Sequence, residues 1–485
     1  MDTAPFAEEL ALEFACAQLG DKRRTDRVME SVRCIARDPQ ESFPNLFDQS
    51  RLEGFYRIVN NSSVSMEALI AGHAGEVCAR AEAYKEVLVL HDTTAFEFDD
   101  SVEREGLGWV KQSARKNRWK SKGDKRGFFG HFSFAVSADG ARRPLGVLSL
   151  TTINRLKRQS KRRKKLSGAQ YAQKRDKESL RWLDGVEVSA GQLEGHASSI
   201  HVMDREGDIA WLLGALVEDD HRFVIRGNYN RRLLGSDAKL REELEHAQLE
   251  LTRTVRLTRR SSSPFPRDRK KHPPRAEREA KLEISWRAVV LKMPKYLQRS
   301  PDEGIPVNVV QVREVDAPTG QKPVEWLLYT TEPVGSAEEI ARVVDAYRAR
   351  WLIEEFFKAL KTGCQFEKRQ LGSYDALLVS LALICPVAWK LLELRFMCRE
   401  QPELPATTVL TLAQLLLLSS LRPSYKLGPK TTLREALLVV ASLGGHIKSN
   451  GEPGWQVIGR GFEKLLQAEL GWLAAQEYLA QGAPG

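Results

Sequence analysis

The chain has 485 residues, of which 42% are hydrophobic and 8% aromatic, so it is long enough for two or three domains and is not disordered as a whole. Its net charge of +10 and pI near 9.2 favour a polyanionic partner, with nucleic acid ahead of an anionic membrane. The six cysteines form neither a CxxC pair nor a cluster with histidine, which argues against a zinc site or disulfide framework and indicates buried thiols in a reducing cytosol.

Targeting and membrane segments are not expected. The N-terminal residues MDTAPFAEELALEF carry acids where a secretory signal would carry basic residues. The longest uncharged run, Ala376 to Trp389, is too short to span a bilayer and contains Pro386. We therefore expect a soluble protein.

Residues 1–67 are predicted to form a small helical domain with a basic corner. Within LGDKRRTDR, Arg23 and Arg27 share one helix face and Arg24 lies beside them. Clustered arginines on a small helical module suit phosphate and groove contacts. An ordinary charged surface explains this segment equally well.

Residues 68–368 change to an alternation of strands and helices. Strands are predicted at 86–92, 127–137, 144–152, 222–228 and 326–331 from their apolar runs bounded by turn residues. The segment from residue 198 begins as a strand, turns through Asp204 and Asp208, and continues as a helix. Residues 249–331 are mainly β, so this α/β domain is expected to hold a β-rich insertion at about 206–331.

Residues 369–485 are predicted to be helical, with breaks at Gly and Pro. The last helix runs from Trp455 to about Ala480 and carries an apolar stripe at helical spacing. Such a stripe is more often intramolecular core than a partner surface, although a lone C-terminal helix of this kind could mediate dimerisation.

Three basic tracts interrupt the middle of the chain, at residues 111–126, 155–165 and 267–275. The second, RLKRQSKRRKK, holds eight cations in eleven residues. Runs of like charge at this density repel themselves unless a polyanion neutralises them, which favours DNA or RNA. A flexible insertion is the alternative.

The segment from Ser336 to Lys361 is predicted to be one helix. Ser336 and Glu339 form a capping box, no Gly or Pro interrupts the run, and Gly363 stands where a left-handed C-terminal cap belongs. At about 100° per residue, Tyr347, Arg350, Glu354 and Lys361 fall on one narrow stripe. A carboxylate flanked by two cations and a phenol can hold a metal and a phosphodiester together, whereas an ordinary solvated, ion-paired face is the alternative.

Two aspartates, Asp92 and Asp204, each follow an apolar predicted strand. Either one alone is more often an Asx turn or a helix N-cap. Together with Glu354 they supply the three hard carboxylates that two-metal phosphoryl transfer needs, with ions about 4 Å apart.

The spacing Tyr347-x₂-Arg350-x₃-Glu354-x₆-Lys361 resembles the Y-R-E-K signature of bacterial cut-and-paste DDE transposases of the IS-four family, and its context IEEFFKALKTG resembles the Tn-five type. The resemblance covers nearly the whole chain. LGDKRRTDR and EGFYRIVNN resemble the end-binding domain, HDTT and DREGDI the two Asp motifs, WLLYTTEPV the strand before the signature helix, and GFEKLLQAELGWLAAQEYLAQG the C-terminal helix. The basic tract at 155–165 and much of 369–450 depart from the family.

The resemblance implies an RNase H-like catalytic core in which Asp92, Asp204 and Glu354 are catalytic metal ligands. It implies that Arg350 and Lys361 clamp phosphates of the cleaved end and that Tyr347 donates to one. Trp326 would stack on a base flipped from the transposon end, a contact worth about 1–3 kcal/mol, although a buried strand tryptophan is the commoner finding. The further end-contacting positions implied are Arg23, Arg24, Arg27, Arg57 and Arg226.

The family mechanism implied is nicking at the transposon 3′ end, hairpin formation on the opposite strand, hairpin opening by water, and joining of the 3′ ends to target DNA. It uses Mg²⁺, two ions per active site, for which Mn²⁺ substitutes. The partners implied are double-stranded DNA and a second copy of the chain, in a homodimer whose contacts lie in residues 369–485. The location implied is the bacterial cytoplasm, at the nucleoid. A catalytically silent end-binding repressor and a structure-specific nuclease on the same core are the alternatives.

Overall fold

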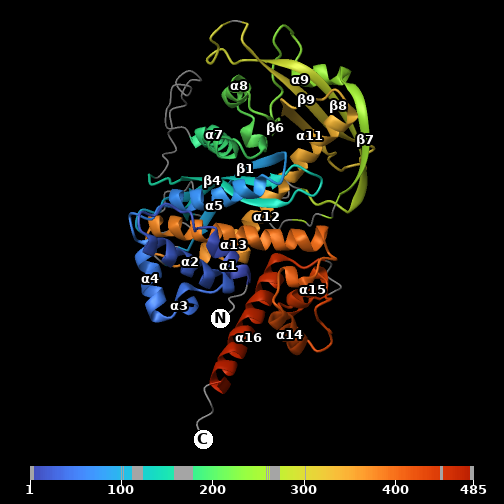
Figure 1. The fold of residues 1–485 in the computed structure, drawn as a ribbon. Coiled ribbons are helices and arrows are strands. Elements are labelled where there is room, and N and C mark those ends of the chain that lie inside the picture. The colour runs from blue at the N-terminus through green and yellow to red at the C-terminus, as the bar shows by residue number, and fades with distance from the viewer. Residues whose placement is uncertain are drawn as a thin grey trace.

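The computed structural model places a twisted central sheet between two layers of helices, with further helices at the N- and C-terminal ends (Figure 1). The structure describes residues 5–99, 101, 103–111, 124–157, 178–257, 259, 262, 273–300, 302–447 and 452–480. The basic tracts predicted at 111–126, 155–165 and 267–275 lie mostly outside these residues.

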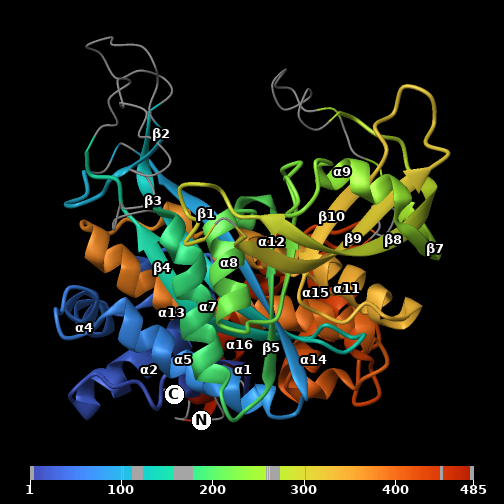
Figure 2. The ribbon, with the colours of Figure 1, turned by 90° about the horizontal axis from the view of Figure 1, so that it is seen from above.

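The strands form one mixed sheet in the order β2-β3-β1-β5-β6-β10-β9-β8-β7, and β4 also pairs with β3. In chain order they are β1 (Glu86–Phe98), β2 (Trp109–Lys111), β3 (Lys125–Ser137), β4 (Pro144–Ile153), β5 (Ser198–Met203), β6 (Phe223–Arg226), β7 (Gln248–Leu257), β8 (Arg278–Lys292), β9 (Gly304–Val315) and β10 (Glu325–Thr330). β1, β5 and β6 are parallel, and the other pairings are antiparallel. The β-rich part predicted between residues 249 and 331 therefore extends the same sheet beyond β6 (Figure 2).

Helices cover both faces of the sheet, which explains why its parallel strands are apolar on both sides. On one face α7 and α8 pack on residues such as Val89 and Ile225, and on the other α11, α12 and α13 pack on Leu90 and Val224. The helices are α1 (Pro5–Leu12), α2 (Lys22–Arg37), α3 (Phe43–Leu46), α4 (Gln49–Val59), α5 (Met66–Ala81), α7 (Arg181–Leu193), α8 (Ala210–Glu218), α9 (Leu240–Glu243), α11 (Ala337–Ala349), α12 (Trp351–Lys358), α13 (Tyr374–Glu400), α14 (Leu412–Leu421), α15 (Leu433–Leu443) and α16 (Trp455–Ala480).

The first strand is longer than predicted. Its expected end at Asp92 is wrong, because antiparallel pairing with β3 continues from Val87 opposite Ser137 to Phe98 opposite Arg126. What ends near Asp92 is the parallel neighbour β5, whose last pairing places Met203 opposite His91. Asp92 therefore lies inside a strand, at the point where the sheet loses a neighbour.

The predicted single helix at 336–361 is also corrected. Ser336 caps it as expected, since its hydroxyl accepts the amide of Glu339 at 3.3 Å. The helix is interrupted at Arg350, between α11 and α12, and ends in a π-helical turn over Ala359–Gly363. The left-handed position expected at Gly363 falls instead at Gln365 (φ 48°), two residues after this π-helical turn.

A buried ionic network joins the N-terminal helices to the sheet. Glu13, 3% exposed, accepts from His73 Nδ1 at 2.5 Å and from Arg80 Nη1 at 2.6 Å. His73 Nε2 accepts the amide of Val147 on β4, which leaves the ring proton on Nδ1 for Glu13. Burial opposes ionisation of Glu13, but His73 and Arg80 outweigh it and lower the pKa of Glu13 to about 2.

We predict that Glu13→Gln lowers the free energy of unfolding by about 3 kcal/mol, because Arg80 and His73 lose a buried ionised partner. Since the folded-state pKa of Glu13 lies below its ordinary value of 4.5, the carboxylate stabilises the fold at neutral pH. That contribution is lost as the pH falls from about 4.5 towards 2. Denaturant unfolding at pH 7 measures the change.

Glu9→Gln is the matched control: it removes a carboxylate paired with Lys390, but Glu9 is 57% exposed, so a loss below about 1 kcal/mol is expected. Equal losses in both variants would contradict the role of Glu13.

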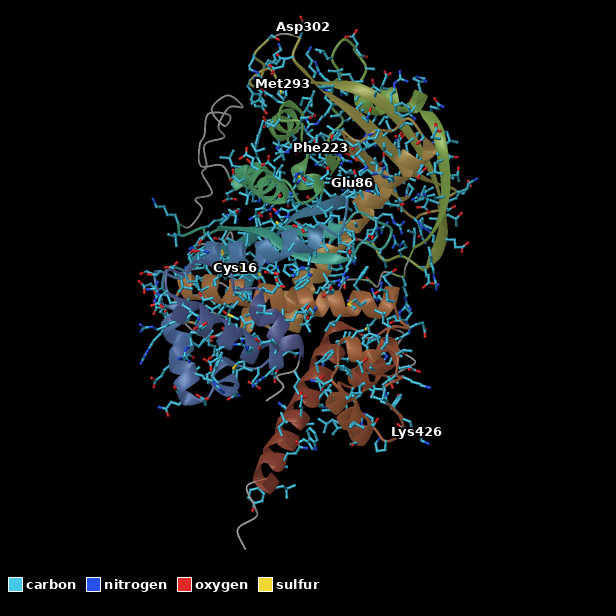
Figure 3. All side chains as sticks on the ribbon, in the orientation of Figure 1. Cys16, Glu86, Phe223, Met293, Asp302 and Lys426 are labelled. Carbon is cyan, nitrogen blue, oxygen red and sulfur yellow. The ribbon has the colours of Figure 1, made fainter. Side chains whose placement is uncertain are left out.

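The C-terminal helices bear out part of the predicted core. α13 is long and apolar enough to cross a membrane, but 94% of its most apolar 18-residue window is buried inside the described fold, as in a core helix. In α16 the side chains of Ile458 and Leu465 are buried, whereas Trp472 and Leu479 further along are exposed. Five cysteines are buried as expected, and Cys16, in the N-terminal region, is exposed (Figure 3).

Candidate active site

The carboxylates predicted to bind metal come from three elements that meet at one edge of the parallel strands. β1 and β5 run side by side up to His91 and Met203, so Asp92 and Asp204 follow at neighbouring positions. α12, which carries Glu354, packs against β1. This is the carboxyl end of parallel strands, where sites in such sheets usually lie.

Arg350 connects two of the three carboxylates. Its Nη1 lies 3.0 Å from Asp92 Oδ2, and its Nη2 pairs with Glu354 Oε1. Arg350 stands at the interruption between α11 and α12, and its side chain, 15% exposed, reaches Asp92 within β1. Asp92 and Glu354 are therefore separated by the width of one guanidinium group.

The charges of Asp204 and Glu354 both act on Asp92. Burial raises the pKa of Asp92 to about 7; Arg350 opposes this shift, whereas Asp204 and Glu354 add to it. Asp204 also caps a short 3-10 turn, because its Oδ1 accepts the amide of Glu206 at 2.7 Å. The common structural role of an aspartate after a strand is thus present at Asp204, together with its place beside Asp92.

The donor set suits a divalent cation, although the described residues contain no group of three or more His, Cys, Asp or Glu side chains that could hold a metal as they stand. Two of the three carboxylates, those of Asp92 and Glu354, are instead paired with Arg350. The carboxylate oxygens are hard ligands of the kind that Mg²⁺ prefers. Burial, with a smaller contribution from the charges of Asp204 and Glu354, disfavours ionisation of Asp92 and raises its pKa, and a bound cation would favour the ionised form. The chemistry of these donors fits a divalent metal ion, and Arg350 pairs with two of the three carboxylates in this structure.

The other two signature residues point elsewhere. Tyr347 is 5% exposed, and its hydroxyl accepts from Arg226 Nη1 at 3.3 Å. Lys361 Nζ donates to the carbonyl of Ala95 on β1 at 2.5 Å and lies 3.8 Å from Glu367. Of the four residues that the sequence places on one helix face, Arg350 and Glu354 pair with each other at the carboxylates. Tyr347 and Lys361 instead contact Arg226 and Ala95.

Trp326 belongs to an aromatic cluster beside this site. Its ring is edge-on to Tyr347 at 5.1 Å between centroids, and the Arg226 guanidinium carbon lies 5.8 Å from both rings. Trp326 lies on β10, a strand that the sequence predicted. Its side chain is partly buried, so part of the ring is exposed to solvent. Arg226, on the neighbouring strand β6, is close enough to take part in a shared subsite.

The four N-terminal arginines lie on α2 and α4. The side chain of Arg57 is 82% exposed and pairs with Glu53 at 3.5 Å, while Arg27 pairs with Glu30 and packs near Gly54 of α4. Arg24 donates to the carbonyl of Leu19 at 2.8 Å. Arg23 is exposed on the first turn of α2. α2 and α4 therefore present arginines that differ in exposure: Arg23 and Arg57 are exposed, whereas Arg24 and Arg27 are partly buried.

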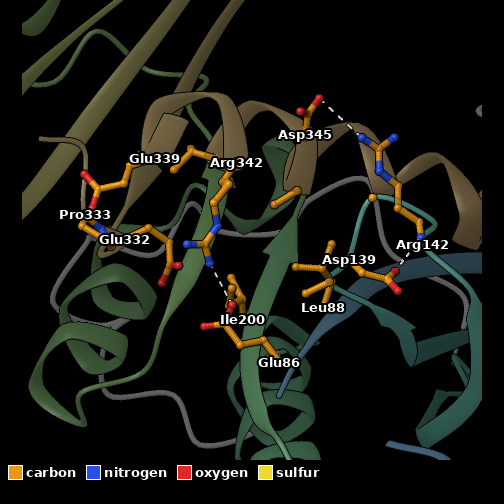
Figure 4. A pocket seen from close by; sticks show the side chains of 14 residues that line it. Glu86, Leu88, Asp139, Arg142, Ile200, Glu332, Pro333, Glu339, Arg342 and Asp345 are labelled. Atoms are coloured by element: carbon orange, nitrogen blue, oxygen red, sulfur yellow. Dashed lines mark hydrogen bonds and ion pairs between the residues drawn. The ribbon is translucent and has the colours of Figure 1, made fainter. Parts of the chain in front are cut away.

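A charged cavity of about 150 Å³ lies at the opposite end of the paired strands β1 and β5 (Figure 4). Arg342 pairs there with Glu86 at 2.8 Å, and Arg142 pairs with Asp345 at 3.4 Å. Each arginine has a carboxylate partner, and the pairs tie α11 to the sheet. This cavity is at the amino end of the parallel strands, away from the predicted site.

Sequence reasoning did not single out Arg181, the first residue of α7, which reaches the same edge of the sheet from the other face. No motif marks it. The available signal is weak: a cation at the start of a helix, where a negative residue is usually favoured.

Two family models match the chain. Residues 7–64 match the family described as transposase DNA-binding, which includes all four N-terminal arginines. Residues 208–387 match the family described as transposase DDE domain, which includes Glu354 and the signature residues around it but begins after Asp92 and Asp204. Transposase DDE domains act with divalent metal ions in cleaving and joining DNA. The chain therefore carries a transposase DNA-binding domain followed by a transposase DDE domain, the organisation of a DNA transposase of the DDE class.

Proposed function

We propose that the chain is a cut-and-paste transposase of the IS-four family and Tn-five type, which cleaves transposon ends through a hairpin and joins them to target DNA. The observation that carries the proposal is the meeting of Asp92, Asp204 and Glu354 at one edge of the sheet. The sheet order β4-β3-β1-β5-β6, with only the last three strands parallel, supports an RNase H-like core.

The three carboxylates would hold two Mg²⁺ ions, which would stabilise the attacking and leaving oxygens of each phosphoryl transfer. Arg350 would exchange its contacts with Asp92 and Glu354 for a DNA phosphate, because a phosphate oxygen is an equally good partner for a guanidinium fork. Lys361 would leave the carbonyl of Ala95 for a second phosphate.

The cluster of Trp326, Tyr347 and Arg226 would receive a base flipped from the end of the transposon. An aromatic ring offers a stacking face to any base, and the adjacent guanidinium adds attraction to the phosphate beside it. This arrangement supports a hairpin step, in which a strained strand must be held open.

We propose three parts for the chain. Residues 1–67 bind transposon ends, residues 68–368 are catalytic with a β-rich insertion at about 206–331, and residues 369–485 mediate a homodimer. The exposed apolar side chains on the distal half of α16, Trp472, Leu473 and Leu479, support the last assignment. The proposed place of action is the bacterial nucleoid.

The deciding experiment incubates the full chain with Mg²⁺ and a duplex carrying the inverted repeats that flank its coding region. Hairpin ends followed by joined products are expected on a denaturing gel. Nicks without hairpins or joining would favour a structure-specific nuclease on the same core. Binding without any cleavage would favour an end-binding repressor.

A further inference from the structure

Arg181 connects three segments at the edge of the sheet where the carboxylates meet. Its Nε donates to Thr93 Oγ1 at 2.9 Å, and Thr93 directly follows Asp92. Its Nη2 lies 3.3 Å from Glu206 Oε2, in the turn that Asp204 caps. Its Nη1 donates to the carbonyl of Glu178 at 2.6 Å. One side chain therefore spans β1, the turn after β5 and the start of α7.

This arginine is not an ordinary surface cation. Its side chain is 13% exposed and lies over the ring of Trp182, at 5.2 Å from the ring centre. Burial lowers the pKa of Arg181, and the charges of Glu206, Glu178 and Asp204 oppose that shift. A buried guanidinium is retained where its fixed fork of donors matches several acceptors, and here each nitrogen has a different acceptor.

The hydroxyl of Thr93 also contacts a second residue, His131. Because Arg181 Nε can only donate, Thr93 Oγ1 accepts a hydrogen bond from it. The Thr93 hydroxyl in turn donates a hydrogen bond to His131 Nδ1 at 2.9 Å. Burial, followed by the charge of Arg181, lowers the pKa of His131 to about 3, so the ring is neutral. The hydrogen bonds therefore run from Arg181 to Thr93 and from Thr93 to His131, whose Nδ1 is the acceptor. Together they fix the rotamer of Thr93, the residue next to Asp92.

We propose that Arg181 is a positioning residue of the active site, which sets the separation between Asp92 and Asp204 by tying Thr93 to Glu206. The inference rests on the proposed function. Arg350 holds Asp92 from the α12 side and Arg181 holds its neighbour from the α7 side, so the two guanidiniums flank the carboxylates from opposite faces of the sheet. Two carboxylates that share metal ions need a fixed separation, because a misplacement of about 1 Å can cost about 100-fold in rate.

The test compares Arg181→Met and Arg181→Lys with the wild-type chain on transposon-end DNA. Arg181→Met is expected to slow nicking about 100-fold at saturating DNA and to raise the Mn²⁺ concentration for half-maximal nicking about tenfold. Its affinity for end DNA in Ca²⁺, measured by gel shift, is expected to stay within about threefold of wild type. Arg181→Lys keeps the charge but cannot reach Thr93 and Glu206 together, so it should recover less than about a tenth of the wild-type rate.

A second readout does not depend on turnover. Mn²⁺ binding to the chain with end DNA, followed by electron paramagnetic resonance, should weaken about tenfold in Arg181→Met. Thr93→Val, which removes only the hydroxyl between Arg181 and His131, should shift Mn²⁺ binding in the same direction and by less. Arg278→Met is the matched control, because Arg278 is a similarly buried arginine, 11% exposed, that joins β8 to Glu314 on β9, away from the parallel strands; its Mn²⁺ binding should equal that of wild type.

Three results would overturn the inference. The first is an Arg181→Met variant with wild-type Mn²⁺ binding and rate. The second is full rescue by lysine, which would mean that charge alone matters. The third is a loss confined to DNA affinity, with a smaller salt slope, which would identify a phosphate contact instead. Absence of cleavage by the wild-type chain in the same assay would refute the proposed function and is distinguishable from all three.

Discussion

Replacement of Glu354 by alanine is expected to abolish cleavage of transposon-end DNA, by about a thousandfold or more, and to leave end binding unchanged. The carboxylate lies beside Asp92 through their shared partner Arg350, so its loss removes one of the three metal ligands proposed for the site. Metal stabilisation of the transition state is worth several kcal/mol, and each 1.4 kcal/mol is a factor of about ten in rate. Nicking, hairpin formation and joining on one labelled substrate measure the three steps, and a gel shift in Ca²⁺ measures binding.

Glu355→Ala is the matched control for this prediction. Glu355 is the next residue of α12, but its carboxylate pairs with Lys358 and Arg395, away from Asp92. The control variant also lacks one carboxylate of this helix. Its cleavage rate, corrected for the folded fraction that thermal unfolding measures, should equal that of the wild-type chain. Strand transfer by Glu354→Ala at more than about a hundredth of the wild-type rate would refute the assignment of Glu354.

The second large effect concerns metal binding in the absence of DNA. Arg350 occupies the space between Asp92 and Glu354, so a cation and the guanidinium compete for the same oxygens. We expect Arg350→Met to bind Mn²⁺ about tenfold more tightly than the wild-type chain when no DNA is present, and also to lose cleavage, because its phosphate contact is gone. A coupling of this size, 1–3 kcal/mol, is typical of two linked binding events.

Linkage adds a quantitative condition to this result. If a DNA phosphate draws Arg350 away from the carboxylates, end DNA must raise the Mn²⁺ affinity of the wild-type chain by the same factor as Mn²⁺ raises its affinity for DNA. Titration calorimetry measures both arms. Arg348→Met is the control, since Arg348 pairs with Asp345 on the exposed side of α11 and should leave Mn²⁺ binding unchanged. Unchanged or weaker Mn²⁺ binding by Arg350→Met would show that the guanidinium does not compete with metal.

Much of the local structure follows from patterns that need no partner. The apolar runs at β3, β4, β5 and β6, the cap at Ser336 and the last helix were predictable because each depends on residues near one another in the chain. The β-rich part up to β10 was predictable as strands, but its continuity with the parallel strands was not, because strand order depends on pairings between distant segments.

Three features that the sequence did not predict have specific physical causes. The extension of β1 past Asp92 is imposed by antiparallel pairing with β3, which overrides the polar residues that suggested a turn. The interruption at Arg350 occurs in a run without Gly or Pro, so no local signal predicts it, and Gly363 at the end of the π turn suggested only a C-terminal cap. Arg181 was missed because its importance lies in contacts to Thr93 and Glu206, which are distant in the chain.

By itself the sequence determined the residue types: two aspartates after apolar runs, a glutamate in a helix with arginine and lysine at fixed spacing, and a helical N-terminal segment with clustered arginines. The tertiary structure decided which of these side chains touch. It brought Asp92 and Glu354 to one guanidinium, turned Lys361 towards Ala95, and placed Tyr347 under Arg226. The physical reason is that spacing along a helix fixes the direction of a side chain only relative to its own axis. The partner in that direction is set by sheet pairing and by the packing of helices on both faces.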